Sequence, residues 1–215
     1  MAATTTNTKT KKIVLFDFDG VMVDTFPLAL GIAKKLSQVS TPAEYRKMFE
    51  GNIYDFLKND RPELNSQNHQ DDWFSLYRPG LLKLPLVKKI KSVLRRLAQK
   101  YLLIIISSTI SSPIKEYANL HDISRYFTEV FGADVHKSKI EKINMVFKKY
   151  QAKPKDCVFI TDTLGDIREA THAGVKSLAV TYGFHNKKTL EKGSPIAFIE
   201  SPDKIPQAVD QYFAK

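Results

Sequence analysis

Short apolar runs that alternate with longer amphipathic segments constrain the fold of this chain more than any other feature. The runs are typical of strands buried on both faces, and we place them at residues 13–16, 102–106, 158–160 and 177–180, with a short edge strand at 197–199. Helical patterns lie at 112–120, 140–150, 165–173 and 205–213. Strands that alternate with helices form a parallel sheet covered on both faces. We therefore expect an α/β fold with a doubly wound, Rossmann-like parallel sheet.

One interval, residues 26–83, interrupts this alternation. It contains turn-rich joints and no convincing strand, and its helical stretches lie at 28–36, 43–49 and 71–77. We therefore predict a small helical cap at 26–83, inserted after the first strand. The predicted core domain then consists of residues 13–25 and 84–215.

The composition excludes several classes of protein. The chain has 215 residues, of which 43% are hydrophobic and 26% charged, as in an ordinary globular protein. No apolar run approaches the roughly 20 residues that a membrane helix needs, and residues 1–12 are polar, without an apolar signal core. We predict a disordered tail at 1–12, a cytoplasmic location and no membrane partner. The single cysteine, Cys157, excludes an internal disulfide and stands in an apolar run typical of a core position.

Much of the net charge of +10 falls on one segment, residues 86–100. An apolar stripe runs along this segment at helical spacing, and lysines and arginines cover the rest, as on a solvated helix face. No zinc-ligand spacing, recognition-helix motif or basic patch with interleaved aromatic residues accompanies the charge. We therefore do not expect nucleic acid as a partner. An attraction for anionic small molecules is the expected consequence of the charge.

Polar side chains follow each of the first three long strands. In chain order they are Asp17 and Asp19, Ser107 and Ser108, and Asp162 and Asp166. In an open parallel sheet the ligand site lies outside the carboxyl ends of the strands. Acids and hydroxyls therefore converge at one rim, which suits a divalent cation and a phosphate.

The chemistry of these groups points to phosphoryl transfer. Close carboxylates repel one another unless a cation intervenes, and Mg²⁺ prefers oxygen ligands and usually binds together with phosphate and water. Asp17 would bind the ion and attack phosphorus, forming an aspartyl phosphate. Asp19 would protonate the leaving oxygen and then deprotonate the hydrolytic water. Asp162 would complete the metal's protein ligands, Asp166 would hold a metal-bound water or support the loop, and Ser107 would donate to the phosphoryl oxygens.

A lysine is needed to neutralise the remaining charge of the phosphate, and two compete for this role. The stretch "SKIE" from Ser138 to Glu141 has the pattern of a capping box, which makes Lys139 the first helical residue. A lysine there opposes the helix dipole unless an anion lies nearby. We therefore favour Lys139 and keep Lys137 as the alternative, with Ser108 as a further substrate-binding residue.

The motifs "DFDG", "IIISS", "KSK" and "ITDTLGD", in this order, resemble the four motifs of the haloacid dehalogenase-like hydrolase superfamily, most of whose members are Mg²⁺-dependent phosphatases. The resemblance covers most of the chain. It implies that Asp17 is the nucleophile, that Asp19 is the acid/base and binds the metal through its backbone carbonyl, that Ser107 and Lys139 bind phosphate, and that Asp162 is a metal ligand. "DGVMVDT" is similar to the branch of phosphoglycolate phosphatases and β-phosphoglucomutases, whose helical cap is inserted at the corresponding place.

The sequence thus predicts a Mg²⁺-dependent phosphatase that acts on a small phosphorylated metabolite through an aspartyl phosphate. The alternatives are a β-phosphoglucomutase-like phosphomutase and a catalytically silent binding or regulatory module on the same fold. Two polar cap residues, Arg46 and Asn52, are further candidates to contact an anionic substrate. The sequence leaves the identity of the substrate and the oligomeric state open.

Overall fold

A parallel sheet forms the centre of the structure, a computed structural model that describes residues 11–64 and 66–214. Its strand order is β3-β2-β1-β4-β5-β6, and every neighbouring pair is parallel. The strands are β1 (Ile13–Phe16), β2 (Leu102–Ile106), β3 (Glu129–Phe131), β4 (Cys157–Thr161), β5 (Lys176–Val180) and β6 (Ala197–Ile199). This topology confirms the predicted doubly wound α/β fold.

Both faces of the sheet are covered by helices, as the fully buried β1 requires. Alternate side chains of a strand point to opposite faces, and β1 divides accordingly. Val14 and Phe16 pack in one cluster with residues of α5 (Ile90–Ala98), α6 (Ser111–Leu120) and α10 (Ile205–Phe213). Ile13 and Leu15 pack in the other cluster with α7 (Lys139–Tyr150) and α8 (Leu164–His172).

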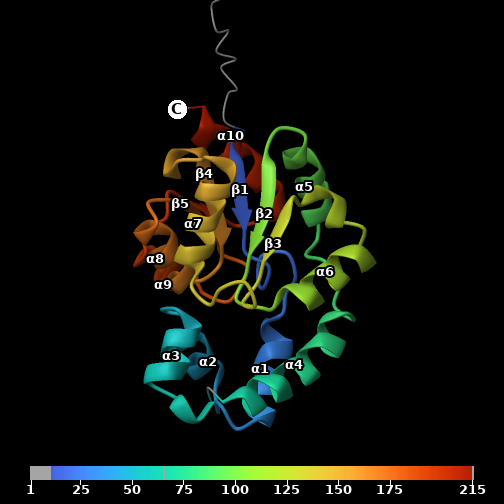
Figure 1. Cartoon of the computed structure of the whole chain (residues 1–215), viewed down its shortest axis with the longest axis vertical. Helices are drawn as coiled ribbons and strands as arrows, with labels where there is room; N and C mark the ends of the chain where they lie inside the picture. Colours follow the sequence, from blue (N-terminus) through green and yellow to red (C-terminus); the bar gives the residue numbers. More distant parts are fainter. Residues whose placement is uncertain (1–10, 65, 215) are drawn as a thin grey trace, which may run out of the picture.

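The segment between β1 and α5 is helical. It contains α1 (Phe26–Lys35), α2 (Pro42–Lys47), α3 (Ile53–Asn59), a short 3₁₀ helix (Pro62–Leu64) and α4 (Gln67–Leu81). We call these helices the cap and the rest of the described chain the core. Figure 1 shows the cap as a separate layer below the sheet, beyond the edge at which the strands end. The site predicted at the carboxyl ends of the strands therefore faces the cap.

Apart from the short 3₁₀ helices, three elements of the described chain were not predicted: the edge strand β3, the cap helix α3 and the short helix α9 (Lys187–Glu191). The other predicted elements are present, with ends that differ by a few residues. Most of the predicted tail, residues 1–10, lies outside the described residues, whereas Lys12 forms an ion pair with Asp156 at 2.6 Å. In the described part of the chain no helix is both long and apolar enough to cross a membrane. Cys157 is buried in β4, as predicted.

Candidate active site

Asp17 directly follows β1 and is buried against the end of the sheet. Its backbone N–H donates to the carbonyl of Ile160 in β4 (2.9 Å), and its Oδ1 accepts a hydrogen bond from the N–H of Phe18 (2.8 Å). Burial raises the pKa of Asp17, and the neighbouring Lys139 ammonium only partly offsets this effect. The chain thus holds a carboxylate in a place where its charge is disfavoured without an additional cation.

Lys139 supplies a positive charge at the centre of the site. It is the first residue of α7 and is almost completely buried, with Nζ 3.0 Å from Asp17 Oδ1 and 2.6 Å from Asp166 Oδ2. Burial alone would lower its pKa, but the two carboxylates outweigh burial and raise it. Asp166 also accepts a hydrogen bond from the Thr161 hydroxyl (2.6 Å), and despite burial, Lys139 lowers its pKa. The structure thus pairs Asp166 with Lys139.

Asp162 follows β4 and is fully buried. Its Oδ2 accepts a hydrogen bond from the N–H of Phe184 (2.6 Å), whereas its Oδ1 has no hydrogen-bond partner among the described residues. Burial, together with repulsion from Asp166, raises the pKa of Asp162 to about 8. A buried carboxylate oxygen without a partner is costly, and a cation would remove this cost.

These carboxylates fit Mg²⁺ when the ion also has ligands from outside the protein. In the part of the chain that the structure describes, no group of three or more His, Cys, Asp or Glu side chains is arranged to hold a metal ion. Asp17 and Asp162 provide carboxylate oxygens, and Mg²⁺ commonly binds through one or two carboxylates and keeps several waters and a substrate phosphate. Oδ2 of Asp166 is engaged by both Lys139 and the Thr161 hydroxyl, whereas Asp162 Oδ1 has no partner among the described residues. Asp17 and Asp162 are therefore the carboxylates that could hold the ion.

Gly20 is required by the close approach of the loop after β1 to Asp162. Its φ of +72° lies in the left-handed region, and a Cβ there would be 1.9 Å from Asp162 Oδ2. We expect Gly20→Ala to lower the free energy of unfolding by about 2 kcal/mol or more and to impair activity. Urea denaturation and turnover measurements test this. Gly31→Ala is the matched control, because a Cβ at this position in α1 meets nothing within 4 Å; equal losses in both variants would contradict the expectation.

Asp19 is held by hydroxyl groups from both the core and the cap. Its Oδ1 accepts hydrogen bonds from Thr25 Oγ1 (2.8 Å) and Tyr77 Oη, and its Oδ2 accepts one from Thr109 Oγ1 (2.8 Å). Neither Tyr77 nor Thr109 was predicted as a site residue. Thr109 follows two serines at the end of β2 and could have been included with them. Nothing in the local sequence distinguishes Tyr77 from the other cap aromatic residues.

Ser107 is fully buried at the end of β2. Its Oγ accepts a hydrogen bond from the N–H of Thr109 (2.9 Å), and its carbonyl accepts one from Lys142 Nζ (2.5 Å). Lys142 was also missed, although it stands one helical turn after Lys139. Burial and the nearby Lys139 lower the pKa of the Lys142 amine to about 7. A buried amine thus supports the backbone of the loop that follows β2.

A cavity of about 140 Å³ lies between this group of residues and the cap. Asp17, Asp19, Ser108, Thr109 and Lys139 line it from the core. On the opposite side it is lined mostly by apolar and aromatic residues of the cap helices and of the turn after α2, among them Tyr45, Phe49, Tyr54, Leu57, Trp73, Phe74 and Tyr77. Asp17, Asp19, Asp166, Ser108 and Lys139 therefore meet at a single cavity, whereas Asp162 and Ser107 are not among its lining residues.

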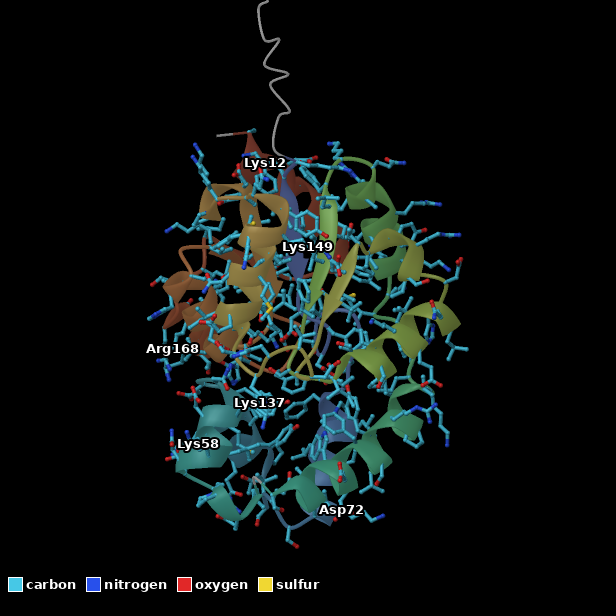
Figure 2. The ribbon with its side chains drawn as sticks, viewed as in Figure 1. Lys12, Lys58, Asp72, Lys137, Lys149 and Arg168 are labelled. Atoms are coloured by element: carbon cyan, nitrogen blue, oxygen red, sulfur yellow. The ribbon has the colours of Figure 1, made fainter. Side chains whose placement is uncertain are left out.

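Arg46, Asn52 and Lys137 do not line this cavity. The Arg46 side chain donates from Nε to the carbonyl of Phe184 (2.7 Å), and its guanidinium lies 4.0 Å from the centre of the Phe26 ring. Lys137 is exposed, with Nζ 5.1 Å from the centre of the Tyr54 ring, and Figure 2 shows it beside the cap. Arg46 and Lys137 thus lie at the junction of cap and core, outside the cavity.

Asn52 connects the cap to the core through Glu169 of α8. Its Oδ1 caps α3, and its Nδ2 donates to Glu169 Oε1 (2.9 Å). The same oxygen accepts hydrogen bonds from Ser138 Oγ (3.2 Å) and from the backbone N–H of Lys139 (2.8 Å). One carboxylate oxygen therefore joins the start of a cap helix to the start of the helix that carries Lys139.

Comparisons with known proteins point to one family. A family model for haloacid dehalogenase-like hydrolases matches residues 14–180. The chain is 24% identical over 220 residues to a phosphoglycolate phosphatase of Vibrio parahaemolyticus, covering 92% of this chain and 96% of that one. It is 26% identical over 222 residues to the phosphoglycolate phosphatase of Vibrio cholerae, covering 92% and 93%. A haloacid dehalogenase-like hydrolase of Streptococcus pneumoniae shares the fold, with a TM-score of 0.75, 22% identity and coverage of 93% and 99%.

Proposed function

The chain belongs to the haloacid dehalogenase-like hydrolases and is a phosphatase, and we propose that it hydrolyses a small phosphorylated metabolite. In this proposal the reaction passes through an aspartyl phosphate on Asp17 and requires Mg²⁺. The observation that carries the proposal is the position of Asp17. It lies on a cavity floor, 3.0 Å from the buried Lys139 ammonium. A carboxylate in this position can approach a phosphate that the lysine also attracts.

Each remaining residue has a proposed role that follows from its contacts. Asp19 is the acid and then the base, oriented by the hydroxyls of Thr25, Tyr77 and Thr109. Lys139 neutralises charge on the phosphoryl oxygens, and Asp166 holds its ammonium in place at 2.6 Å. Ser108 lines the cavity. Its hydroxyl, with that of Ser107 from the same loop, would donate to the phosphate.

We assign the Mg²⁺ to Asp17 and Asp162. When bound, the ion would lower the repulsion between the carboxylates and the incoming phosphate and polarise the phosphoryl oxygen. The support for this assignment is the Oδ1 of Asp162, a fully buried oxygen without a hydrogen-bond partner among the described residues. The division into cap and core domains at residues 26 and 83 and the cytoplasmic location stay predictions.

The stabilising effect of Mg²⁺ is expected to grow with pH. Burial raises the pKa of Asp162 from near 4 to about 8, and that of Asp17 is raised as well. The folded chain therefore binds protons that the unfolded chain releases, so the metal-free protein loses stability as pH rises from about 4 to about 8. Since Mg²⁺ needs the ionised carboxylates, its addition should raise Tm more at pH 8 than at pH 6. Differential scanning calorimetry measures this, and Asp162→Asn should abolish the effect. An equal rise at both pH values would contradict it.

Covalent labelling tests the proposed intermediate. Acetyl phosphate labelled with ³²P and Mg²⁺ should leave acid-stable label on the protein that neutral hydroxylamine removes, as expected for an acyl phosphate. Asp17→Asn should carry no label, whereas Asp72→Asn, at the far end of the cap in Figure 2, should be labelled like the native protein. Equal labelling of the native protein and Asp17→Asn would contradict the assignment. The phosphomutase alternative predicts isomerisation of a sugar phosphate in place of phosphate release.

A further inference from the structure

Aromatic and aliphatic side chains make up most of the cap side of the cavity, and three of the aromatic rings stack on one another. Trp73 lies parallel to Tyr77, with ring centroids 6.3 Å apart, and to Tyr45 at 6.4 Å. Phe49 and Tyr45 also contact the ring of Phe184, which comes from the core, at 5.3 and 6.2 Å. A leaving group that extends from a phosphate at Asp17 toward the cap would meet these faces.

The cap side of the cavity offers no positively charged side chain to a second anionic group of the substrate. Among the described residues that line the cavity, Lys139 is the only one with a positive charge, and it already binds Asp17 and Asp166. The nearby cap cations face elsewhere. Arg61 pairs with Glu63 and donates to the Gln38 carbonyl.

Lys58 is exposed and lies on the outer side of the cap (Figure 2). A carboxylate on the leaving group would therefore lose its hydration in the cavity without gaining an ion pair.

Three of the hydroxyl groups that line the cavity already donate to acceptors within the protein. Tyr54 Oη donates to the Ser108 carbonyl (2.6 Å), and the hydroxyls of Tyr77 and Thr109 both donate to Asp19. A polyhydroxylated leaving group such as a sugar would need many free partners to replace its bonds with water. An apolar ring needs no hydrogen-bond partner. Its binding is favoured because its surface is removed from water and contacts the aromatic faces.

On the basis of the phosphatase function proposed above, we propose that the preferred substrate is a phosphate monoester of an apolar alcohol, with a leaving group no larger than one aromatic ring. The cavity volume of about 140 Å³, part of which the phosphate occupies, sets this upper limit, since an apolar protein cavity of about 150 Å³ accommodates benzene. The proposal separates this chain from the phosphoglycolate phosphatases that it resembles, because phosphoglycolate carries a carboxylate on its leaving group.

The test compares benzyl phosphate with 2-phosphoglycolate, both of which release a CH₂–O oxygen, so that their intrinsic reactivities are similar. With Mg²⁺ and the full-length protein, kcat/KM for benzyl phosphate should be at least tenfold higher. Equal values, or a preference for 2-phosphoglycolate, would overturn this inference and leave the phosphatase function intact. Failure to hydrolyse either ester, together with no labelling by acetyl phosphate, would overturn the proposed function and the inference with it.

A substitution on the cap side of the cavity provides a second, independent test of the substrate preference. Phe74 lines the cavity from α4 and is half-buried. Phe74→Arg should lower kcat/KM for benzyl phosphate at least tenfold and raise that for 2-phosphoglycolate, because it adds the missing cation. Phe74→Leu is the matched control and should keep the preference for benzyl phosphate. Circular dichroism shows whether Phe74→Arg is folded. If the folded variant keeps the native preference for benzyl phosphate, the cap side of the cavity does not select the leaving group.

Discussion

Asp17→Asn is expected to lower the rate of phosphate release by about four orders of magnitude or more, because it removes the proposed nucleophile and leaves only binding and positioning. The substitution should not destabilise the metal-free protein. Burial raises the pKa of Asp17, so a neutral side chain of nearly the same shape relieves an unfavourable buried charge. Phosphate release and Tm, both measured with and without Mg²⁺, test these two effects.

Asp72→Asn is the matched control for this substitution. Asp72 is exposed on the cap helix α4, and the change in charge is the same, so we expect native activity and native Tm. Asp17→Asn should in addition lose much of the Mg²⁺-dependent rise in Tm. Residual activity of Asp17→Asn above about one hundredth of the native rate would contradict the role of Asp17 as nucleophile.

Lys139→Met is expected to reduce both stability and activity. In the native protein, Lys139 Nζ lies 3.0 Å from Asp17 Oδ1 and 2.6 Å from Asp166 Oδ2. The substitution removes this shared cation from the two buried carboxylates. Breaking a buried ion pair from one side costs about 3 to 5 kcal/mol, and the lost charge at the phosphate should lower kcat/KM by about a hundredfold or more. Urea denaturation at pH 7 and turnover measurements test the two losses.

Lys137→Met tests which of the two candidate lysines, Lys137 or Lys139, neutralises the phosphate. Lys137 is exposed, so its replacement should change the free energy of unfolding by no more than about 0.5 kcal/mol and activity by less than tenfold. A comparable loss of activity in Lys137→Met, with Lys139→Met still active, would reverse the assignment.

The strands at the centre of the sheet could be predicted because burial on both faces leaves a continuous apolar run, as in Leu102–Ile106. The edge strand Glu129–Phe131 could not, since its three residues are only half-buried and begin with a charged side chain. The cap helix Ile53–Asn59 carries apolar residues at helical spacing, Ile53, Phe56 and Leu57, but it has only seven residues, so this periodicity is too short to distinguish a helix from a turn. Short elements leave the weakest sequence pattern.

The core side of the candidate site was accessible from the sequence for a related reason. Asp17, Asp19 and Asp162 directly follow predicted strands, so the sheet alone brings them to one edge. The contact between Tyr77 and Asp19 depends instead on how the cap packs against the core, over a separation of 58 residues. Arg46 and Asn52 were predicted as candidates from residue type alone, and the structure engages both in contacts between the two parts.

The shared oxygen of Glu169 limits how the cap and the core can be engineered separately. Asn52, Ser138 and the backbone of Lys139 all donate to it, so a cap exchanged between homologous proteins must bring its own amide to this position. Without that amide, a transplanted cap loses its hydrogen bond to the helix that positions Lys139, even if the new cap folds well. Chimeras should therefore exchange residues 52 and 169 together.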